Sequence, residues 1–203
     1  MRRAPTSAIK GAVSGTSPVA LIIIDMFSDF DSPELKELFH PSLVAARRIA
    51  LLRRRLGGAG VPIIYVNDNE GPWRSSGLSL IERRVSARRG KAIAELLMPR
   101  ADDYLVLKPK HSIFYATPLD VLLTYMKVHT LVLTGLTGTQ CILFSAMDAY
   151  VRDFKVYAPR DCIVSPNAKE AEVSDYVLRS SMNADTETST QLRIAELKRP
   201  PHT

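Results

Sequence analysis

LVLTGLTGTQCILFSAMDAY, residues 131–150, begins with an apolar run of the kind found in buried parallel strands. A short turn with two glycines follows, and Cys141 then opens an amphipathic helix. Unpaired backbone N–H groups and the positive end of the helix dipole favour the thiolate there, which is the nucleophilic form of cysteine. A buried apolar cysteine that packs the strand-to-helix turn is the alternative interpretation. The stretch therefore predicts a strand, a turn and a helix, with Cys141 as either a nucleophile or a packing residue.

Strand and helix patterns alternate along the chain from residue 19. Besides the strand that opens the quoted stretch, apolar runs predict strands at residues 19–25, 61–66, 104–108 and 155–161, and a short one at 187–190. Helical spacing predicts helices at residues 43–56, 91–98, 118–127, 169–182 and 191–198. Such alternation gives βαβ units and a parallel sheet that is covered on both faces. The predicted fold class is α/β, a three-layer α/β/α domain around a mostly parallel, Rossmann-like sheet of about six strands.

Length and composition indicate one domain. The 203 residues are 46% hydrophobic, which is enough for a single full core. We expect this domain at residues 19–203, preceded by a flexible N-terminal arm at residues 1–18 that is rich in Ser, Gly, Ala and Pro. The two cysteines make no disulfide framework, the first residues lack the apolar part of a secretory signal, and no apolar run approaches the roughly 20 residues that span a bilayer. A cytoplasmic location without a membrane partner is expected.

Several binding functions are not supported by the sequence. The net charge of +6 comes mainly from arginines in pairs or triplets within helical segments, which is typical of solvated helix faces. No nucleic-acid motif accompanies them, so no nucleic-acid partner is expected. The first strand is followed by DMFSDF rather than by a glycine-rich dinucleotide turn. Asp68 and Glu70 lack the surrounding ligand spacing of a metal site. We therefore expect no cofactor and no metal.

Polar side chains follow the predicted strands at the edge where open α/β sheets bind ligands. Asp25 ends the first strand, Lys108 ends the third, and Cys141 follows the fourth. If the three converge, the carboxylate can take the thiol proton, the ammonium can stabilise the negative charge, and backbone N–H groups of the turn can hold an oxyanion. Such a site is suited to the hydrolysis of an amide by acyl transfer. A structural Asp25–Lys108 ion pair that caps two strands is the alternative.

Three pieces of sequence occur in a characteristic order. They are IIIDMFSDF within residues 20–30, VLKPKHSIFYATPLDVLL at residues 106–123, and LTGLTGTQCILFSAMDAYVRDFKVYAPRDCIVS at residues 133–165. In combination they resemble the isochorismatase-like cysteine hydrolase superfamily, which includes nicotinamidases, N-carbamoylsarcosine amidases and isochorismatases. The resemblance covers residues 19–198.

The resemblance implies roles for the residues at the sheet edge. Asp25 would be the base, Lys108 the third member of a triad, and Cys141 the nucleophile. A cis peptide bond would join Leu136 to Thr137 and direct the N–H groups of Thr137 and Cys141 to the oxyanion. Metal-dependent nicotinamidases place an Asp and two His after the second strand, whereas this chain has NDNEGPWRSSG without histidine. No metal site of the nicotinamidase type is therefore expected.

The predicted function is hydrolysis of the C–N bond of an amide or carbamoyl group in a small molecule, through a thioester intermediate. True isochorismatases hydrolyse a vinyl ether and lack the nucleophilic cysteine, so Cys141 points to C–N bond hydrolysis instead. One alternative is a vinyl-ether or ester hydrolase of the isochorismatase type that does not use Cys141. The other is a non-catalytic member that only binds a ligand, and the intact Asp25, Lys108 and Cys141 speak against it.

Loop residues on the same edge are candidates for the substrate pocket, with ordinary loop packing or a subunit contact as the alternative. Aromatic side chains would suit an apolar or planar group, and a guanidinium would suit an anion. The candidates are Phe30, Asn67, Trp73, Arg74, Phe114 and Tyr115. No histidine lies at a strand end, and only His111 is close to the edge, which argues against a papain-like Cys–His pair. Family members usually assemble, so the resemblance implies a homodimer or homotetramer.

Overall fold

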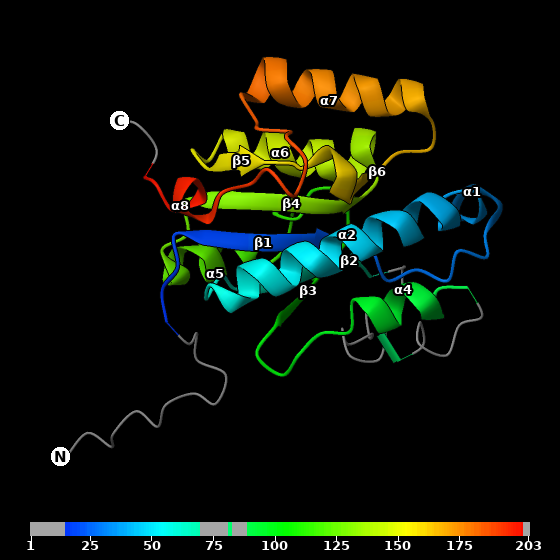
Figure 1. Cartoon of the computed structure of the whole chain (residues 1–203), viewed down its shortest axis with the longest axis horizontal. Coiled ribbons are helices and arrows are strands. Elements are labelled where there is room, and N and C mark those ends of the chain that lie inside the picture. Colours follow the sequence, from blue (N-terminus) through cyan, green and yellow to red (C-terminus); the bar gives the residue numbers. More distant parts are fainter. Residues whose placement is uncertain (1–14, 70–80, 83–88, 201–203) are drawn as a thin grey trace.

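The computed structural model describes residues 15–69, 81–82 and 89–200, and Figure 1 shows a central sheet covered by helices. The strands are β1 (Val19–Ile24), β2 (Ile63–Asp68), β3 (Tyr104–Lys108), β4 (Thr130–Leu136), β5 (Lys155–Tyr157) and β6 (Ile163–Val164). Their order is β3-β2-β1-β4-β5, β6 pairs with the end of β4, and every strand pair is parallel. The predicted α/β class and the Rossmann-like parallel sheet are confirmed.

The central strand β1 is apolar on both of its faces. Each of its residues is 1% exposed or less. Side chains alternate along a strand, so Leu21 and Ile23 enter one core while Ala20 and Ile22 enter the other. β1 lies between β2 and β4 in the sheet. The residue that follows β1 therefore emerges at the middle of the carboxyl edge.

Helices cover both faces of the sheet. Residues of α2 (Phe39–Gly58), α4 (Lys91–Leu96) and α8 (Ile194–Leu197) share one core with the strands, and residues of α5 (Leu119–Met126), α6 (Leu143–Tyr150) and α7 (Ala168–Met182) share the other. A short helix, α1 (Pro33–Lys36), precedes α2. Figure 1 shows α7 as the outermost helix on its side. Among the described residues, no helix combines the length and the apolar character needed to cross a membrane.

The predicted strand at residues 187–190 is wrong. This segment forms a turn, and the sixth strand is β6, which lies directly after a 3₁₀ turn at Arg160–Cys162. The cause is Asp161, whose carboxylate accepts hydrogen bonds from the Ser189 backbone N–H at 2.6 Å and from the Ser189 hydroxyl at 2.7 Å. These bonds hold the segment in a turn. The strand predicted at residues 155–161 also ends early, at Tyr157.

The helix boundaries agree better with the predictions. α4, α5 and α7 each begin and end within two residues of the predicted positions, while α8 is shorter than predicted. α2 starts at Phe39 rather than at residue 43, because Pro41 lies in its first turn, where a missing N–H breaks no helical hydrogen bond. Residues 1–14 of the predicted arm lie outside the described residues.

Candidate active site

Three side chains from three strand ends meet at the carboxyl edge of the sheet. Lys108 is the last residue of β3, Asp25 directly follows β1, and Cys141 lies in the π-helical turn Gly138–Ile142 after β4. Nζ of Lys108 is 2.7 Å from Oδ2 of Asp25 and 3.5 Å from Sγ of Cys141. Lys108 is completely buried, and the other two residues are less than a tenth exposed. The sequence-based convergence of these residues is confirmed.

The carboxylate of Asp25 is fixed from two sides. Its residue has a left-handed backbone, with φ of 54°, and its N–H donates to the carbonyl of Val66 at 2.9 Å. The backbone N–H of Asp68 donates to Oδ1 at 2.7 Å, while the ammonium of Lys108 binds Oδ2. The carboxylate of Asp68 lies farther from Nζ, at 3.9 Å. Asp25 is therefore held in a single position beside the thiol.

The chain between β4 and the cysteine has an unusual backbone. Gly135 has a φ of 116°, and the peptide bond between Leu136 and Thr137 is cis, as predicted. The N–H groups of Gln140 and Ile142 both donate to the carbonyl of Thr137. The cysteine thus lies in a π-helical turn rather than in the first turn of an α-helix, since α6 begins after it.

The protonation of the site differs from the sequence-based expectation. Burial raises the pKa of the Asp25 carboxyl, despite the neighbouring ammonium. Burial, and then the charge of Asp25, raise the pKa of the Cys141 thiol to about 12. Burial is the largest single influence on Lys108 and acts against its charge, but Asp25, Cys141 and Asp68 together outweigh burial and raise the pKa of Lys108. The raised pKa of the thiol runs against the expectation of a favoured thiolate, because burial and the charge of Asp25 together outweigh the charge of Lys108.

The raised pKa of the thiol predicts how Cys141 reacts with iodoacetamide. The thiolate is the reacting form, so the alkylation rate should still rise at pH 10, where a free thiol with its usual pKa near 8.5 has levelled off. The label is located by peptide mass, and Cys162 provides the internal control because it is completely buried. A plateau below pH 8.5 would show instead that the thiolate already exists in the resting site.

A pocket of about 310 Å³ opens onto Asp25 and Cys141. Asp25 and Cys141 lie in its wall together with Phe27, Leu35, His111 and Gln140. A volume of this size is typical of sites for small molecules. The pocket lies at the carboxyl edge of the sheet, beside β1 and β4. The connections that follow these two strands run in opposite directions along the sheet, and open α/β sheets usually bind ligands at such a point.

Comparison with known proteins places the chain in a family. The family model described as the isochorismatase domain matches residues 19–191. The chain belongs to the isochorismatase family. The family membership that the sequence motifs predicted is thereby confirmed. The isochorismatase assignment makes the chain a hydrolase, and cysteine-dependent amide hydrolysis is the kind of reaction found in the family.

Individual relatives of this isochorismatase-family chain are similar over most of its length. YaaI of Bacillus subtilis strain 168, an uncharacterised isochorismatase family protein, is 33% identical over 173 residues, covering 85% of this chain and 95% of YaaI. Maleamate amidohydrolase of Pseudomonas putida is 28% identical over 152 residues, or 71% of each chain. The crystal structure of N-carbamoylsarcosine amidase from Thermoplasma acidophilum has a TM-score of 0.66 at 24% identity, covering 86% of this chain and 98% of that one, and supports the fold.

Of the four predicted substrate residues of this isochorismatase-family site that the structure describes, three do not line its pocket. Phe30 is completely buried in the core, with its ring 5.8 Å from that of Phe39. Phe114 is also buried, beneath the guanidinium of Arg152 at 4.7 Å. Tyr115 is 60% exposed and lies outside the pocket wall. These three predictions are wrong, because loop position alone does not determine which way a side chain points.

The other three candidates have different outcomes. Asn67 does line the pocket, but its amide is engaged with the backbone of Phe27, from whose N–H it accepts at 3.0 Å and to whose carbonyl it donates at 3.1 Å. It therefore fixes the loop after β1. Trp73 and Arg74 lie outside the described residues.

Sequence reasoning placed His111 close to the edge but gave it no role, and in the structure it lies beside Cys141. Nδ1 of His111 lies 3.6 Å from Sγ of Cys141. The available signal was its position, three residues after Lys108 and on the same edge of the sheet. Phe27 and Gln140 also line the pocket unpredicted. Within residues 15–69, 81–82 and 89–200, no group of three or more His, Cys, Asp or Glu side chains is arranged to hold a metal ion.

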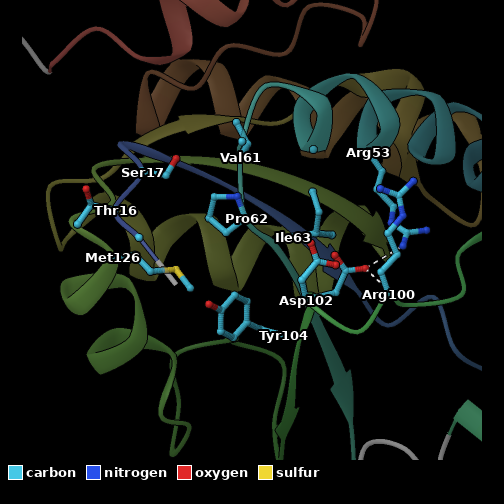
Figure 2. Close-up of a pocket in the computed structure, with 14 residues that line it drawn as sticks. Thr16, Ser17, Arg53, Val61, Pro62, Ile63, Arg100, Asp102, Tyr104 and Met126 are labelled. Atoms are coloured by element: carbon cyan, nitrogen blue, oxygen red, sulfur yellow. Dashed lines mark hydrogen bonds and ion pairs between the residues drawn. The ribbon is translucent and has the colours of Figure 1, made fainter. Parts of the chain in front are cut away.

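Figure 2 shows a second pocket, of about 210 Å³, at the opposite edge of the sheet where β2 and β3 begin. Nη2 of Arg53 is 2.8 Å from Oδ2 of Asp103, and the backbone N–H of Arg100 donates to the same oxygen. This ion pair is nearly buried and joins α2 to the chain before β3. The described wall includes no cysteine or histidine. Its charges serve the fold, and the carboxyl-edge pocket is the candidate active site.

Proposed function

We propose that this isochorismatase-family hydrolase cleaves the C–N bond of a small carboxamide or carbamoyl compound through a thioester on Cys141. The observation that carries this proposal is the position of Nζ of Lys108, 2.7 Å from the Asp25 carboxylate and 3.5 Å from the Cys141 sulfur. A base, a cation and a nucleophile within contact of one another are what acyl transfer from an amide requires.

Acylation begins with transfer of the thiol proton. The S–H bond of Cys141 breaks, the proton binds the Asp25 carboxylate, and the electron pair stays on sulfur. The raised pKa of the Asp25 carboxyl makes it a better proton acceptor than a solvated aspartate. Lys108 touches both groups, so its positive charge stabilises the negative charge before and after the transfer.

The thiolate then attacks the amide carbonyl carbon. A C–S bond forms and the carbonyl electron pair moves to oxygen, where the N–H groups of Thr137 and Cys141 are proposed to hold it. Collapse of this intermediate breaks the C–N bond, and the proton on Asp25 goes to the leaving nitrogen. Ammonia or an amine departs and leaves a thioester on Cys141.

Deacylation uses the same groups in the reverse roles. Asp25 takes a proton from water, and the hydroxide attacks the thioester carbonyl. Collapse breaks the C–S bond, the sulfur regains a proton from Asp25, and the carboxylic or carbamic acid leaves. The resting thiol with its raised pKa is restored, so one water is consumed in each cycle.

The alternatives differ in their need for the cysteine. A vinyl-ether or ester hydrolase would use Asp25 and Lys108 with the sulfur as a bystander. A ligand-binding protein would gain nothing from a buried lysine held against both a carboxylate and a thiol. The contact of Lys108 with Sγ therefore favours cysteine-dependent hydrolysis over both.

The proposal is tested by ammonia release from a panel of small amides that includes maleamate and N-carbamoylsarcosine. For any amide that is turned over, adding hydroxylamine should divert part of the product to the hydroxamate, because hydroxylamine competes with water for a thioester. Prior alkylation of Cys141 should stop the reaction. Turnover of a vinyl ether or ester that continues after alkylation would contradict the proposal and support the cysteine-independent alternative.

A further inference from the structure

We propose that His111 is a further catalytic residue: its Nδ1–H donates a hydrogen bond to Sγ of Cys141 and stabilises the thiolate while Asp25 holds the proton. This inference rests on the proposed amide hydrolysis and adds to its triad a group from a separate loop. The distance between Nδ1 and Sγ is 3.6 Å, which is within hydrogen-bond range for the large sulfur atom. His111 also lies in the wall of the pocket, beside the reacting atoms.

The thiolate needs a second donor because Lys108 is shared. Its ammonium lies closer to the Asp25 carboxylate, at 2.7 Å, than to the sulfur, at 3.5 Å. Cys141 is only 8% exposed, so water provides little solvation for a negative charge on sulfur. An anion in such surroundings is stabilised chiefly by the donors that the protein supplies. Nδ1 of His111 is in place to be one of them.

The loop that carries His111 is fastened to the helix that follows the nucleophile. The hydroxyl of Ser112 donates to the carboxylate of Asp148, and the N–H of Ile113 donates to the hydroxyl of Ser145 at 3.1 Å. Asp148 and Ser145 both belong to α6. The two residues directly after His111 are thus held against α6, which continues from the turn that contains the cysteine.

The imidazole ring itself has a packing partner on the same helix. Its centroid is 5.4 Å from that of Phe144, with an angle of 45° between the planes. Aromatic rings at this separation attract one another in tilted arrangements. Together with the anchored loop, this contact sets the distance between Nδ1 and the sulfur.

A donor role fits the charges better than a base role. A protonated ring would be repelled by the ammonium of Lys108, because both cations would lie beside the same sulfur, which is 3.5 Å from Nζ. Asp25 already provides an acceptor for the thiol proton. In the proposed step, the S–H bond breaks, the O–H bond on Asp25 forms, and the N–H bond of His111 stays intact throughout.

The test compares two substitutions of His111, of which only one keeps an N–H donor near the sulfur of Cys141. His111→Asn keeps an N–H group close to the position of Nδ1, whereas His111→Phe keeps an aromatic ring against Phe144 and removes the donor. At pH 8, the iodoacetamide rate constant of Cys141 should fall roughly tenfold in His111→Phe and by less than about threefold in His111→Asn. kcat for amide hydrolysis should follow the same order, with KM nearly unchanged. His129→Asn, at the amino edge of the sheet, is the matched control and should change neither quantity.

Two results would overturn the assignment. Equal alkylation rates in wild type and His111→Phe would mean that the ring gives the sulfur no stabilisation. Equal losses in the Phe and Asn variants would mean that the ring acts as a base, since asparagine cannot take a proton. The alkylation readout needs no substrate, so it separates this inference from the proposed function. If the variants are alkylated in the expected order but the wild-type protein hydrolyses no amide, amide hydrolysis is contradicted, while the hydrogen bond from His111 to Cys141 is supported.

Discussion

Cys141→Ala is expected to lower kcat for amide hydrolysis at least about a thousandfold, because no other group can form the thioester. The substitution removes one sulfur atom from the pocket wall and leaves the Asp25–Lys108 ion pair in place. The free energy of unfolding should therefore change by about 1 kcal/mol or less. Steady-state ammonia release and urea unfolding measure the two quantities.

Cys162→Ala is the matched control for this substitution. It removes the other cysteine, which is completely buried in the core and is absent from the pocket wall. Activity should remain within about threefold of wild type, since only packing is altered. If Cys141→Ala retained most of its activity, the cysteine would be a bystander and the vinyl-ether or ester alternative would take the place of amide hydrolysis.

Gly135→Ala is expected to prevent stable folding. Gly135 has a φ of 116°, which an L side chain rarely adopts, and a Cβ atom there would lie 1.9 Å from the carbonyl oxygen of Ile24. That oxygen belongs to the central strand β1, which pairs with β4 along its whole length, so neither backbone can move aside. The expected loss exceeds about 4 kcal/mol, at the extreme of single substitutions. Urea unfolding, or recovery only in inclusion bodies, would report it.

Gly57→Ala is the contrasting glycine substitution. Gly57 lies inside α2, has a helical backbone, and has no heavy atom within 4 Å of a new Cβ. Alanine in a helix is favoured over glycine, so the free energy of unfolding should rise by about 0.5–1 kcal/mol. A Gly135→Ala protein as stable as wild type would show that β1 and β4 can separate without cost, contrary to the observed register.

The convergence of Asp25, Lys108 and Cys141 was predictable because parallel strands put their carboxyl ends at one edge. Asp25 and Lys108 each end an apolar run, and Cys141 follows another, so topology alone brings them together. The direction of a loop side chain has no such rule. Phe30 follows the same strand as Asp25, yet its left-handed backbone turns its ring into the core.

The effect of burial on the pKa of Cys141 could not be predicted from the sequence pattern either. A cysteine near a helix start suggested a thiolate, whereas the folded surroundings of Cys141 raise its pKa to about 12, because burial dominates. Likewise, the segment at residues 187–190 has the composition of a short strand, but the hydrogen bonds from Ser189 to Asp161 hold it in a turn. Both outcomes depend on groups that are distant in sequence. The homo-oligomeric state stays a prediction.

The strand order has a consequence for how the protein is made. β1 is synthesised before the other strands of this sheet, yet its partner on one side is β4, where Val19 pairs with Thr130. Pairings between such distant segments raise the contact order and slow folding. While a chain on the ribosome still lacks β4, one side of β1 has no partner strand, and the loop between them closes only after β4 has been made. The proposed nucleophile Cys141 therefore emerges after Asp25 and Lys108, and the three side chains can meet only once the sheet has closed.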